Sequence, residues 1–335
     1  MDAMSGGDGG MIAEMAARLF GDLAARRGDG FEAIWRPVEE AGFASLLIGE
    51  ERGGFGGGWQ EMFLVQRLAG FHAVPAPVGE SALAAHLLGE TDAPCGAGFA
   101  TIAAGCAGAF FGDRFTGRLS GIPWGRSAGC VVAGHGDGLF AVGVGEGAIT
   151  PGENMAGEPR DALELRGVPV VRLAGDADVF ALGALLRVGQ IAGALDRAFE
   201  LSVAYANDRV QFGKPISKFQ AVQQSLAVFA EQLAATISAG QSASAAQQRG
   251  GAGFEIAAAK LRADMAVDIG AAVAHQVHGA IGFTQDYALH HLTRRLMAWR
   301  AEFGNDRYWA ERIGGMVTGQ TGELWHWLTL RGDAR

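Results

Sequence analysis

One short stretch of the chain combines a cation, an amide, an aromatic ring and an unhindered backbone. It reads Arg209-Val210-Gln211-Phe212-Gly213-Lys214-Pro215-Ile216, and Phe219-Gln220 and Gln223 follow closely. Arginine presents a planar fork of N–H donors that matches phosphate oxygens, glycine permits backbone geometry that other residues avoid, and proline interrupts a helix. The stretch therefore predicts a corner between two helices that suits a phosphate next to a flat ring.

A second stretch with possible chemistry is Gln276-Val277-His278-Gly279-Ala280-Ile281-Gly282-Phe283-Thr284. Its glycines let backbone N–H groups approach a ligand closely. His275 and His278 lie one helical turn apart, but no nearby cysteine or acid completes a ligand set, so we expect no metal. A Ser-His-Asp hydrolase is a weaker alternative, because no Gly-x-Ser-x-Gly elbow follows a predicted strand.

Long helices must position these two stretches. Apolar residues recur every three or four positions from about 182 to 203, from 222 to 237, from 256 to 277 and from 287 to 301. This spacing is typical of helices that bury one face. The first stretch falls between the first two helices and the second stretch ends the third helix, which predicts a C-terminal bundle of four helices.

The preceding part of the chain predicts two further regions. Residues 11–26 have helical spacing, and the glycine-rich loop 53–58 comes before another helix from about Trp59. We interpret that loop as a structural turn, since no Lys-Ser/Thr pair follows it. Between about 97 and 172 the apolar runs are short and separated by turn residues, which is typical of strands. We predict a mainly α chain with a small β-domain, divided into an N-terminal helical domain (1–96), a β-domain (97–180) and a C-terminal helical bundle (181–335).

Together these features resemble the acyl-CoA dehydrogenase family of flavoenzymes, most strongly over residues 185–310 and less so over 31–90. The resemblance implies the acyl-CoA dehydrogenase fold, FAD as cofactor and an acyl-CoA thioester as substrate. In the family the two stretches face each other across a subunit interface and hold the pyrophosphate and adenine portion of FAD. Carried over, this assigns to FAD binding Arg209, Gln211, Phe212, Ile216, Phe219 and Gln223 from the first stretch, and Gln276, Val277, His278 and Gly279 from the second.

The family's reaction also needs a carboxylate base. The base removes a proton from the carbon α to the thioester while a hydride leaves the β carbon for the flavin, and burial must raise its proton affinity. Most members place this glutamate in the loop after the fourth helix, where this chain has Phe303, with Glu302 one residue earlier. Other members place it at the start of the first C-terminal helix, where residues 181–187 contain no acid.

Two interpretations follow from the missing glutamate. In the first, Glu302 serves as the base of a self-sufficient homomeric dehydrogenase. In the second, which we favour, a second acyl-CoA dehydrogenase-like subunit supplies the base and the flavin-ring pocket of a hetero-oligomer. The segment that usually opens the β-domain and helps hold the flavin ring is not recognisable before residues 117–121. Trp124 is either the only remnant of its aromatic or an ordinary core residue of the β-domain. The ending 294–309 resembles small subunits of bacterial dehydrogenases that act on steroid side-chain CoA thioesters.

The resemblance also implies an electron acceptor, because reduced FAD in the family passes its electrons to an electron-transfer flavoprotein. Two alternatives of a different kind stay open. One is a flavin-free scaffold subunit that keeps the bundle for assembly. The other is an oxygen-using relative, an oxidase or a flavin monooxygenase.

Composition restricts the remaining possibilities. A chain of 335 residues that is 49% hydrophobic and 19% charged can bury a large core in two or three domains. Its net charge of -9 argues against a nucleic-acid or anionic-membrane partner. The cysteines Cys95, Cys106 and Cys130 lack metal spacing and predict reduced thiols. The first ten residues lack the pattern of a secretion signal and no run of about 18 uncharged apolar residues follows, so we expect a cytoplasmic protein.

Overall fold

Four α-helices form the N-terminal part of the computed structural model, which describes residues 7–89, 91, 95–96, 98–136, 138–320 and 322–330. They are α1 (Gly7–Ala25), α2 (Phe31–Glu40), α3 (Trp59–His72) and α4 (Val78–Leu88). The glycine-rich loop before α3 uses its backbone N–H groups internally, since Gly56 donates to the Ile48 carbonyl at 2.8 Å and Gly57 to the Leu46 carbonyl at 2.9 Å. Those N–H groups are not available to a phosphate, as the structural interpretation of the loop requires.

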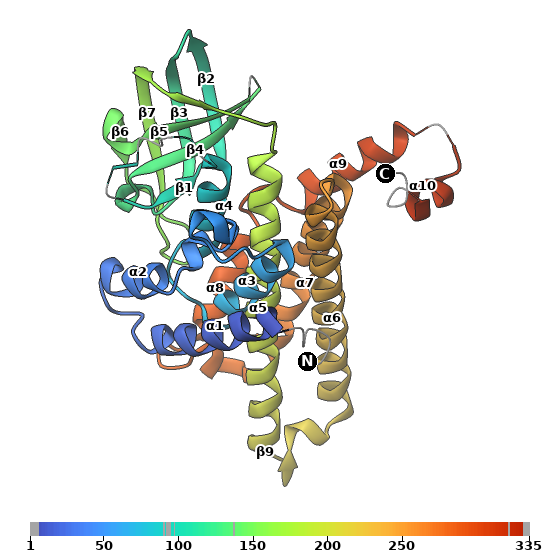
Figure 1. Ribbon diagram of the computed structural model, residues 1–335. Coiled ribbons are helices and arrows are strands. Elements are labelled where there is room, and N and C mark those ends of the chain that lie inside the picture. The colour runs from blue at the N-terminus through green and yellow to red at the C-terminus, as the bar shows by residue number, and fades with distance from the viewer. Residues whose placement is uncertain are drawn as a thin grey trace.

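Two small sheets form the β-domain at one end of the molecule (Figure 1). Their strand orders are β1-β4-β5-β8 and β2-β3-β7-β6. The strands are β1 (Ala100–Ile102), β2 (Gly105–Phe111), β3 (Arg114–Pro123), β4 (Cys130–His135), β5 (Gly138–Gly143), β6 (Ala148–Thr150), β7 (Arg160–Pro169) and β8 (Val171–Leu173). Side chains alternate between the faces of a strand. Val131 of β4 therefore joins Phe115 and Phe140 in a core between the sheets, while its neighbour Val132 joins the larger core of the helices.

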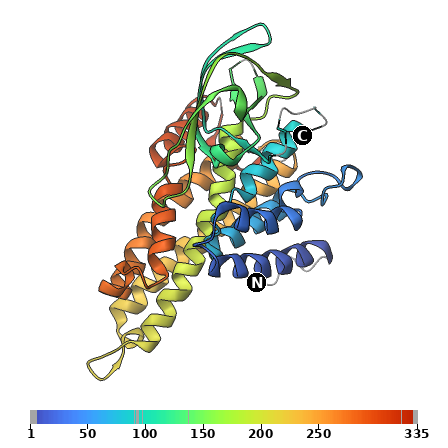
Figure 2. The same cartoon turned by 90° about the vertical axis from the view of Figure 1, so that its left-hand side faces the viewer.

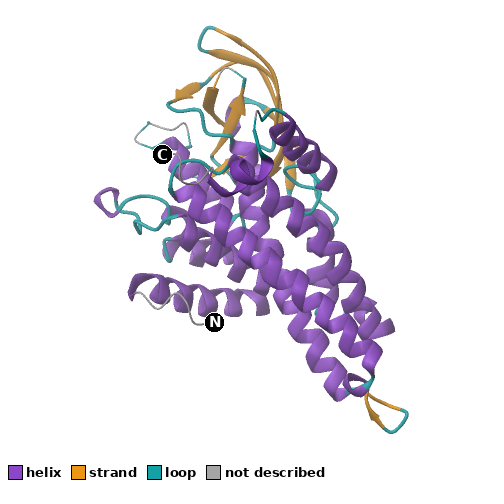
Figure 3. Ribbon diagram, turned by 90° about the vertical axis from the view of Figure 1, so that its right-hand side faces the viewer, coloured by secondary structure: helices purple, strands orange, loops and turns teal. Residues whose placement is uncertain are grey.

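The C-terminal part is the four-helix bundle that the apolar spacing predicts. Its helices are α5 (Val179–Asp208), α6 (Gln220–Gln248), α7 (Gly253–His278) and α8 (Leu289–Trp299), followed by α9 (Asp306–Thr318) and α10 (Leu324–Leu330). A hairpin of β9 (Val210–Gln211) and β10 (Lys214–Pro215) joins α5 to α6. Figures 2 and 3 show this hairpin protruding at the end of the bundle opposite the β-domain. The predicted fold class, mainly α with a small β-domain, is confirmed.

The predicted domain boundaries lie close to element boundaries. The first strand begins at Ala100 and α5 begins at Val179. Residue 97, at which we divide the first two domains, lies outside the described residues, as do residues 1–6 and 331–335 at the predicted outer limits. The exact division of the chain stays a prediction.

The central helix of the molecule is α5, which packs against α3, α6, α7 and α8. Asp178 caps it, because its carboxylate accepts a hydrogen bond from the Ala181 N–H at 3.0 Å. Among the described residues, α5 is the one helix long and apolar enough to cross a membrane, and 89% of its apolar window is buried inside the structure. A helix that is apolar on all sides and covered by protein is the core helix of its domain.

The prediction of reduced thiols is wrong for two of the three cysteines. Cys95 and Cys130 form a disulfide, with Cα atoms 4.4 Å apart. The physical reason is tertiary: the segment after α4 returns beside β4, where Gly129 donates to the Phe99 carbonyl at 2.9 Å. The sequence separation of 35 between the two cysteines hides this proximity in the sequence. Cys106 is free.

Candidate active site and cofactor site

The first predicted stretch forms the hairpin between α5 and α6. Phe212 and Gly213 have φ angles of 52° and 79°, the left-handed conformations of a two-residue hairpin turn. Phe212 is 91% exposed. Arg209 is also exposed, and its side chain has no hydrogen-bond or ion-pair partner among the residues that the structure describes. The hairpin thus offers an unpaired guanidinium and an exposed aromatic ring that contacts Phe219 edge to face, the combination that a phosphate next to a flat ring requires.

The other predicted residues of this stretch differ in how available they are. The side chain of Gln211 is exposed and that of Ile216 is half-buried. Phe219 carries the Lys214 ammonium 4.5 Å from its ring centroid. Gln223 donates to a backbone carbonyl of the preceding turn at 2.9 Å. Arg209, Gln211 and Phe212 are therefore the side chains of this stretch that are open to a ligand or to a second subunit.

The second predicted stretch ends α7 beside the last turn of α5. The contact is fixed by His278, whose ring stacks on Tyr205 with centroids 4.8 Å apart. Gln276 and Gly279 are exposed, and Gly279 has a φ of 64° with nothing within 4 Å of the position that a Cβ would take. The structure therefore brings the two stretches to the same end of the bundle.

Two members of the second stretch point inward instead. Val277 and His278 are buried. Nδ1 of His278 lies 2.7 Å from the Ala274 carbonyl, and Nε2 lies 3.1 Å from the Tyr287 hydroxyl. Burial lowers the pKa of His278, so the ring is neutral at pH 7. Its position is that of a packing residue, and direct contact of either side chain with FAD stays a prediction.

The described residues contain no group of His, Cys, Asp or Glu that could hold a metal ion. Nε2 of His275 lies 3.0 Å from the Thr293 hydroxyl, and its ring stacks on Phe283 with centroids 4.1 Å apart. With His278 also hydrogen-bonded within the chain, the two histidines are used in packing rather than arranged as a ligand pair.

The β-domain does not present side chains to a flavin ring at the place where the family resemblance expects them. Thr101 in β1 is fully buried and donates its hydroxyl to the Pro123 carbonyl at 2.9 Å. Trp124 is 6% exposed, and the Arg160 guanidinium lies 5.2 Å from its ring. Both side chains are core residues of the domain, so neither is exposed to a flavin ring.

The two positions at which the family resemblance places a catalytic glutamate lie next to each other. Phe303, in the loop between α8 and α9, is 3% exposed and fills the space beside Gly183 of α5. A Cβ on Gly183 would overlap the Phe303 ring. Phe303 has a φ of 52°, a strained conformation for a residue with a side chain, and its carbonyl accepts from Trp309 Nε1 at 3.0 Å. An aromatic ring and a glycine thus occupy both positions.

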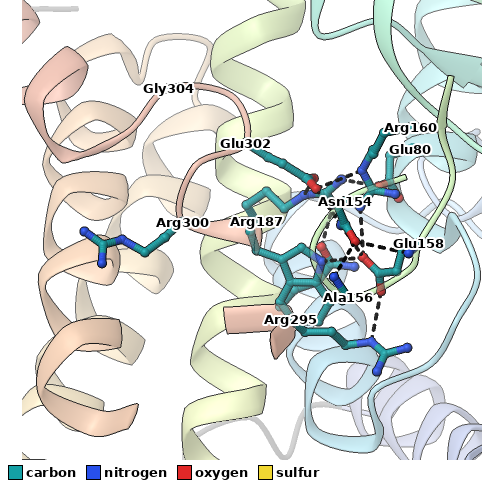
Figure 4. Close-up of polar contacts among 12 residues, drawn as sticks. Glu80, Asn154, Ala156, Glu158, Arg160, Arg187, Arg295, Arg300, Glu302 and Gly304 are labelled. Atoms are coloured by element: carbon teal, nitrogen blue, oxygen red, sulfur yellow. Dashed lines mark hydrogen bonds and ion pairs between the residues drawn. The ribbon is translucent and has the colours of Figure 1, made fainter. Parts of the chain in front are cut away.

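Glu302, the candidate base, is bound on both carboxylate oxygens (Figure 4). Oε2 accepts from Arg187 Nε at 2.7 Å. Oε1 accepts from Arg160 Nε at 2.9 Å and from the Asn154 amide at 2.8 Å. Burial raises the pKa of Glu302, but the Arg187 and Arg160 guanidiniums and the Asn154 amide outweigh it and lower the pKa to about 2. A carboxylate with so low a proton affinity and no free oxygen is unsuited to abstract a proton.

Arg187 extends this contact into a buried ionic cluster that joins three parts of the molecule. It is fully buried in α5 and pairs with Glu80 of α4 at 2.7 Å as well as with Glu302. From the β-domain, Arg160 pairs with Glu158 at 3.0 Å, and Glu158 in turn accepts from Arg295 of α8 at 2.9 Å. Buried charges that satisfy one another fix the geometry of the elements that carry them. The cluster holds the N-terminal helices, the β-domain and the bundle in register around the Glu302 loop.

Lys260 of α7 fixes the same loop from the other side. Its ammonium lies 3.0 Å from the Arg300 carbonyl and 2.8 Å from the Gly304 carbonyl, and it pairs with Asp264 at 2.7 Å. Lys260 and Asp264 are both fully buried. With Glu302 held by two arginines, the loop 300–304 is anchored at each end and in the middle.

A cavity of about 760 Å³ lies between the β-domain and the start of α5. Cys106, His135, Asp176 and Phe180 are among its lining residues. Burial raises the pKa of the Cys106 thiol to about 11, so this cysteine is protonated at neutral pH and is no nucleophile. The cavity offers space for a ligand but no activated group.

The sequence reasoning missed Arg187, Glu80 and Arg160. One signal was present for Arg187, because it is the only charge in the apolar stretch 179–195 of a helix. A long charged side chain is almost never fully buried unless it is paired. Its partners Glu80 and Glu302 have no comparable signal, since both lie more than 100 residues from it in the chain.

Comparison with protein families and known proteins shows that the chain is similar to acyl-CoA dehydrogenases. Residues 176–316 match the family model described as the acyl-CoA dehydrogenase C-terminal domain. The chain is 29% identical over 268 residues to acyl-CoA dehydrogenase IpdE2 of Mycobacterium tuberculosis, covering 77% of this chain and 78% of that protein. It is 34% identical over 156 residues to acyl-CoA dehydrogenase FadE34 of the same organism, covering 45% of this chain but only 21% of that protein.

Solved structures share the fold over nearly the whole chain. The ChsE4–ChsE5 complex from Mycobacterium tuberculosis matches with a TM-score of 0.84 at 24% identity, covering 96% of this chain and 100% of that chain. A variant of the Tcur3481–Tcur3483 steroid ACAD also matches with a TM-score of 0.84, at 22% identity and covering 92% of this chain and 97% of that chain. These matches confirm the predicted acyl-CoA dehydrogenase fold.

Proposed function

We propose that this chain is one subunit of a hetero-oligomeric, FAD-dependent acyl-CoA dehydrogenase, on the premise that residues 176–316 match the C-terminal domain of that family. In this complex a second acyl-CoA dehydrogenase-like subunit supplies the catalytic base and the pocket for the flavin ring. The present chain supplies Arg209 and the turn at the end of α7 to the pyrophosphate and adenine portion of FAD.

The observation that carries the proposal is the packing of Phe303 on Gly183. Both family positions for the base are occupied without a carboxylate, and the nearest acid, Glu302, is held by Arg187 and Arg160 with a pKa near 2. Proton abstraction next to a thioester needs a buried carboxylate with a raised pKa. The site in this chain has the opposite electrostatics, so the base comes from another subunit.

The residues at the hairpin end fit one half of an FAD site. Arg209 is free to form charge-assisted hydrogen bonds with phosphate oxygens, and the exposed Phe212 can cover a flat ring. Gly279 leaves its backbone open for close approach. When bound, FAD supplies the acceptor for the hydride that leaves the β carbon of the substrate. The residues of this chain bind and orient the dinucleotide, and the partner's carboxylate takes the proton from the α carbon.

The similar proteins also support a proposal about the assembly and the substrate of this chain. The two structural relatives named above are described as a two-protein complex and as a steroid ACAD, which supports a heteromer and an acyl-CoA substrate of steroid-degradation type. We propose a tetramer of two unlike subunits, with an electron-transfer flavoprotein as the acceptor of electrons from reduced FAD.

A flavin-free scaffold is the second candidate function, and the filled base position favours it equally. The two candidates differ at Arg209, because a scaffold has no need of an unpaired guanidinium next to an exposed ring. Visible absorbance separates them: the purified complex of a dehydrogenase subunit shows flavin bands whose intensity depends on Arg209, whereas flavin in a scaffold complex does not depend on this residue.

The direct test compares the purified chain with the chain co-expressed with an acyl-CoA dehydrogenase-like protein encoded beside it. We expect the chain alone to show no acyl-CoA dehydrogenation with an artificial electron acceptor, and the co-purified complex to show it. Activity of the chain alone, abolished by Glu302→Gln at unchanged FAD content, would establish the self-sufficient homomeric enzyme instead.

A further inference from the structure

Two guanidiniums and two imidazoles from four separate elements gather around α5. Arg27 follows α1, His72 ends α3, Arg197 lies on α5 and His291 lies on α8. The helices α3 and α8 both pack on α5. Arg197 lowers the pKa of Arg27 and Arg27 lowers the pKa of His291, so these side chains lie within electrostatic range of one another. Nη2 of Arg27 donates to the His72 carbonyl at 2.7 Å. The gathering is local, since the chain as a whole has a net charge of -9.

Arg27 is the arginine of this cluster that has no acidic partner among the described residues. No carboxylate of the described residues pairs with it, and its buried Nε–H has no hydrogen-bond acceptor. The adjacent Arg26, in contrast, pairs with Asp29 at 2.9 Å on the surface. A buried donor without an acceptor is destabilising, so a ligand that accepts from Arg27 would remove this cost.

The acids nearest to the cluster are already engaged. Arg197 pairs with Glu200 at 3.0 Å, and Arg295, next to His291, donates to the His291 carbonyl at 3.1 Å but is paired with Glu158. These pairs leave the charge of Arg27 uncompensated.

The charges of the cluster act on one another. Burial lowers the pKa of Arg27, and the guanidiniums of Arg295 and Arg197 lower it further. The pKa of His72 is lowered by burial, Arg197 and Arg27, with Glu200 acting in the opposite direction. The pKa of His291 is lowered to about 4 by burial and by His290, Arg27, Arg295 and Arg294. An anion bound beside Arg27 would relieve the repulsion between the guanidiniums of Arg27, Arg197 and Arg295.

We propose that Arg27, together with His72, Arg197 and His291, forms a binding site for a phosphate-type oxyanion. Such an anion accepts several hydrogen bonds from different directions, and the planar guanidinium fork matches its oxygens. The same chemistry is offered by free phosphate and by the phosphate of a nucleotide. The site uses other residues than the proposed FAD contacts, although Arg197 also acts on the pKa of Tyr287, which is hydrogen-bonded to His278.

The test is isothermal titration calorimetry of the full-length chain, in its complex where one forms, at constant ionic strength. Inorganic phosphate and adenosine 3′-monophosphate are titrated separately, so that tighter binding of the nucleotide identifies a nucleotide ligand and equal binding identifies the phosphate group alone. We expect Arg27→Gln to weaken binding about 10-fold or more, as expected for loss of a hydrogen bond to a charged group. Arg26→Gln is the matched control and leaves the affinity unchanged.

A proton measurement distinguishes this site from general charge attraction. Anion binding raises the pKa of His72, so binding near pH 6 is accompanied by proton uptake, measured as the difference in heat between two buffers of unlike ionisation enthalpy. Arg27→Lys retains the charge but lacks the fork and Nε, and it replaces Arg27→Gln if that variant does not fold. Absence of saturable binding, or an equal loss of affinity in the Arg26 and Arg27 variants, overturns the proposal.

Discussion

Phe303 packs its ring on the backbone of Gly183, at the place where the family resemblance predicts a catalytic glutamate. The ring is 3% exposed and is also close to Arg187, whose guanidinium lies 5.3 Å from its centroid. The contact joins the loop after α8 to the start of α5 without a carboxylate. Its energetic and functional consequences can be measured separately.

Gly183→Ala should destabilise the fold. The added methyl group would overlap the Phe303 ring, and overpacking of a core costs about 1–3 kcal/mol. Gly314→Ala in α9 is the matched control, because nothing lies within 4 Å of its Cβ position and alanine is favoured over glycine in a helix by about 1 kcal/mol. Urea denaturation measures both. If the loss of stability arises from overlap with the Phe303 ring, a second substitution, Phe303→Leu, should restore part of the stability. Equal effects of Gly183→Ala and Gly314→Ala would contradict the packing.

Glu302→Gln should leave the turnover of the heteromer nearly unchanged while lowering its stability. The substitution leaves the buried Arg187 and Arg160 facing a neutral amide, and breaking a buried ion pair costs about 3–5 kcal/mol. Glu311→Gln is the control, since Glu311 forms an exposed pair with Arg307. Steady-state kinetics below the unfolding temperature and thermal melts give the two readouts. Loss of proton abstraction with full FAD content and an intact fold would make Glu302 the base.

The stability of the chain should also fall in acid because of Glu302. Its pKa is lowered from 4.5 to about 2 by Arg187, Arg160 and Asn154 acting against burial. A group with a lowered pKa in the folded state stabilises the fold above its unfolded pKa, and this contribution disappears as the pH falls toward about 2. The shift corresponds to about 3 kcal/mol. Urea midpoints between about pH 6 and pH 3 should fall less steeply in Glu302→Gln than in the unmodified chain, and parallel slopes would contradict the assignment.

The helices could be predicted from the sequence because a buried face leaves a local record. The spacing of Leu185, Val188, Ala192 and Leu195 predicts α5, and all four are buried. The buried ion pairs leave no such record. Arg187 and Glu302 are 115 residues apart, and whether their side chains meet depends on how α5 packs against the end of α8. The same reason explains the missed disulfide between Cys95 and Cys130, whose closeness exists only in the folded chain.

The candidate cofactor residues were predictable as a pair of stretches but not in their individual orientation. Helix periodicity placed the first stretch at the end of α5 and the second at the end of α7. Because α6 runs back between them, α5 and α7 point in the same direction and their ends lie at the same end of the bundle. The inward position of His278 could not be predicted, because it depends on Tyr205 and Tyr287, which surround the ring. Exposure separates Arg209 and Gln276 from the buried members of the same stretches.

Arg209→Ala should lower the FAD content of the purified complex. Loss of a charge-assisted hydrogen bond to phosphate weakens binding by about 1.5–3 kcal/mol, which is 10-fold or more in affinity. The control is Arg249→Ala at the other end of α6, which removes an equal charge from the same helix pair. The ratio of flavin absorbance to protein absorbance after dialysis is the measurement. An unchanged ratio in Arg209→Ala would remove this residue from the FAD site.

The central claim is that this chain completes an active site whose base belongs to a different subunit, and the mass of the intact complex tests it most directly. Native mass spectrometry of the chain co-expressed with its genomic neighbours should show an assembly of two unlike subunits with fewer FAD molecules than chains. A homotetramer of this chain alone with one FAD in every subunit, active toward an acyl-CoA, would contradict the claim.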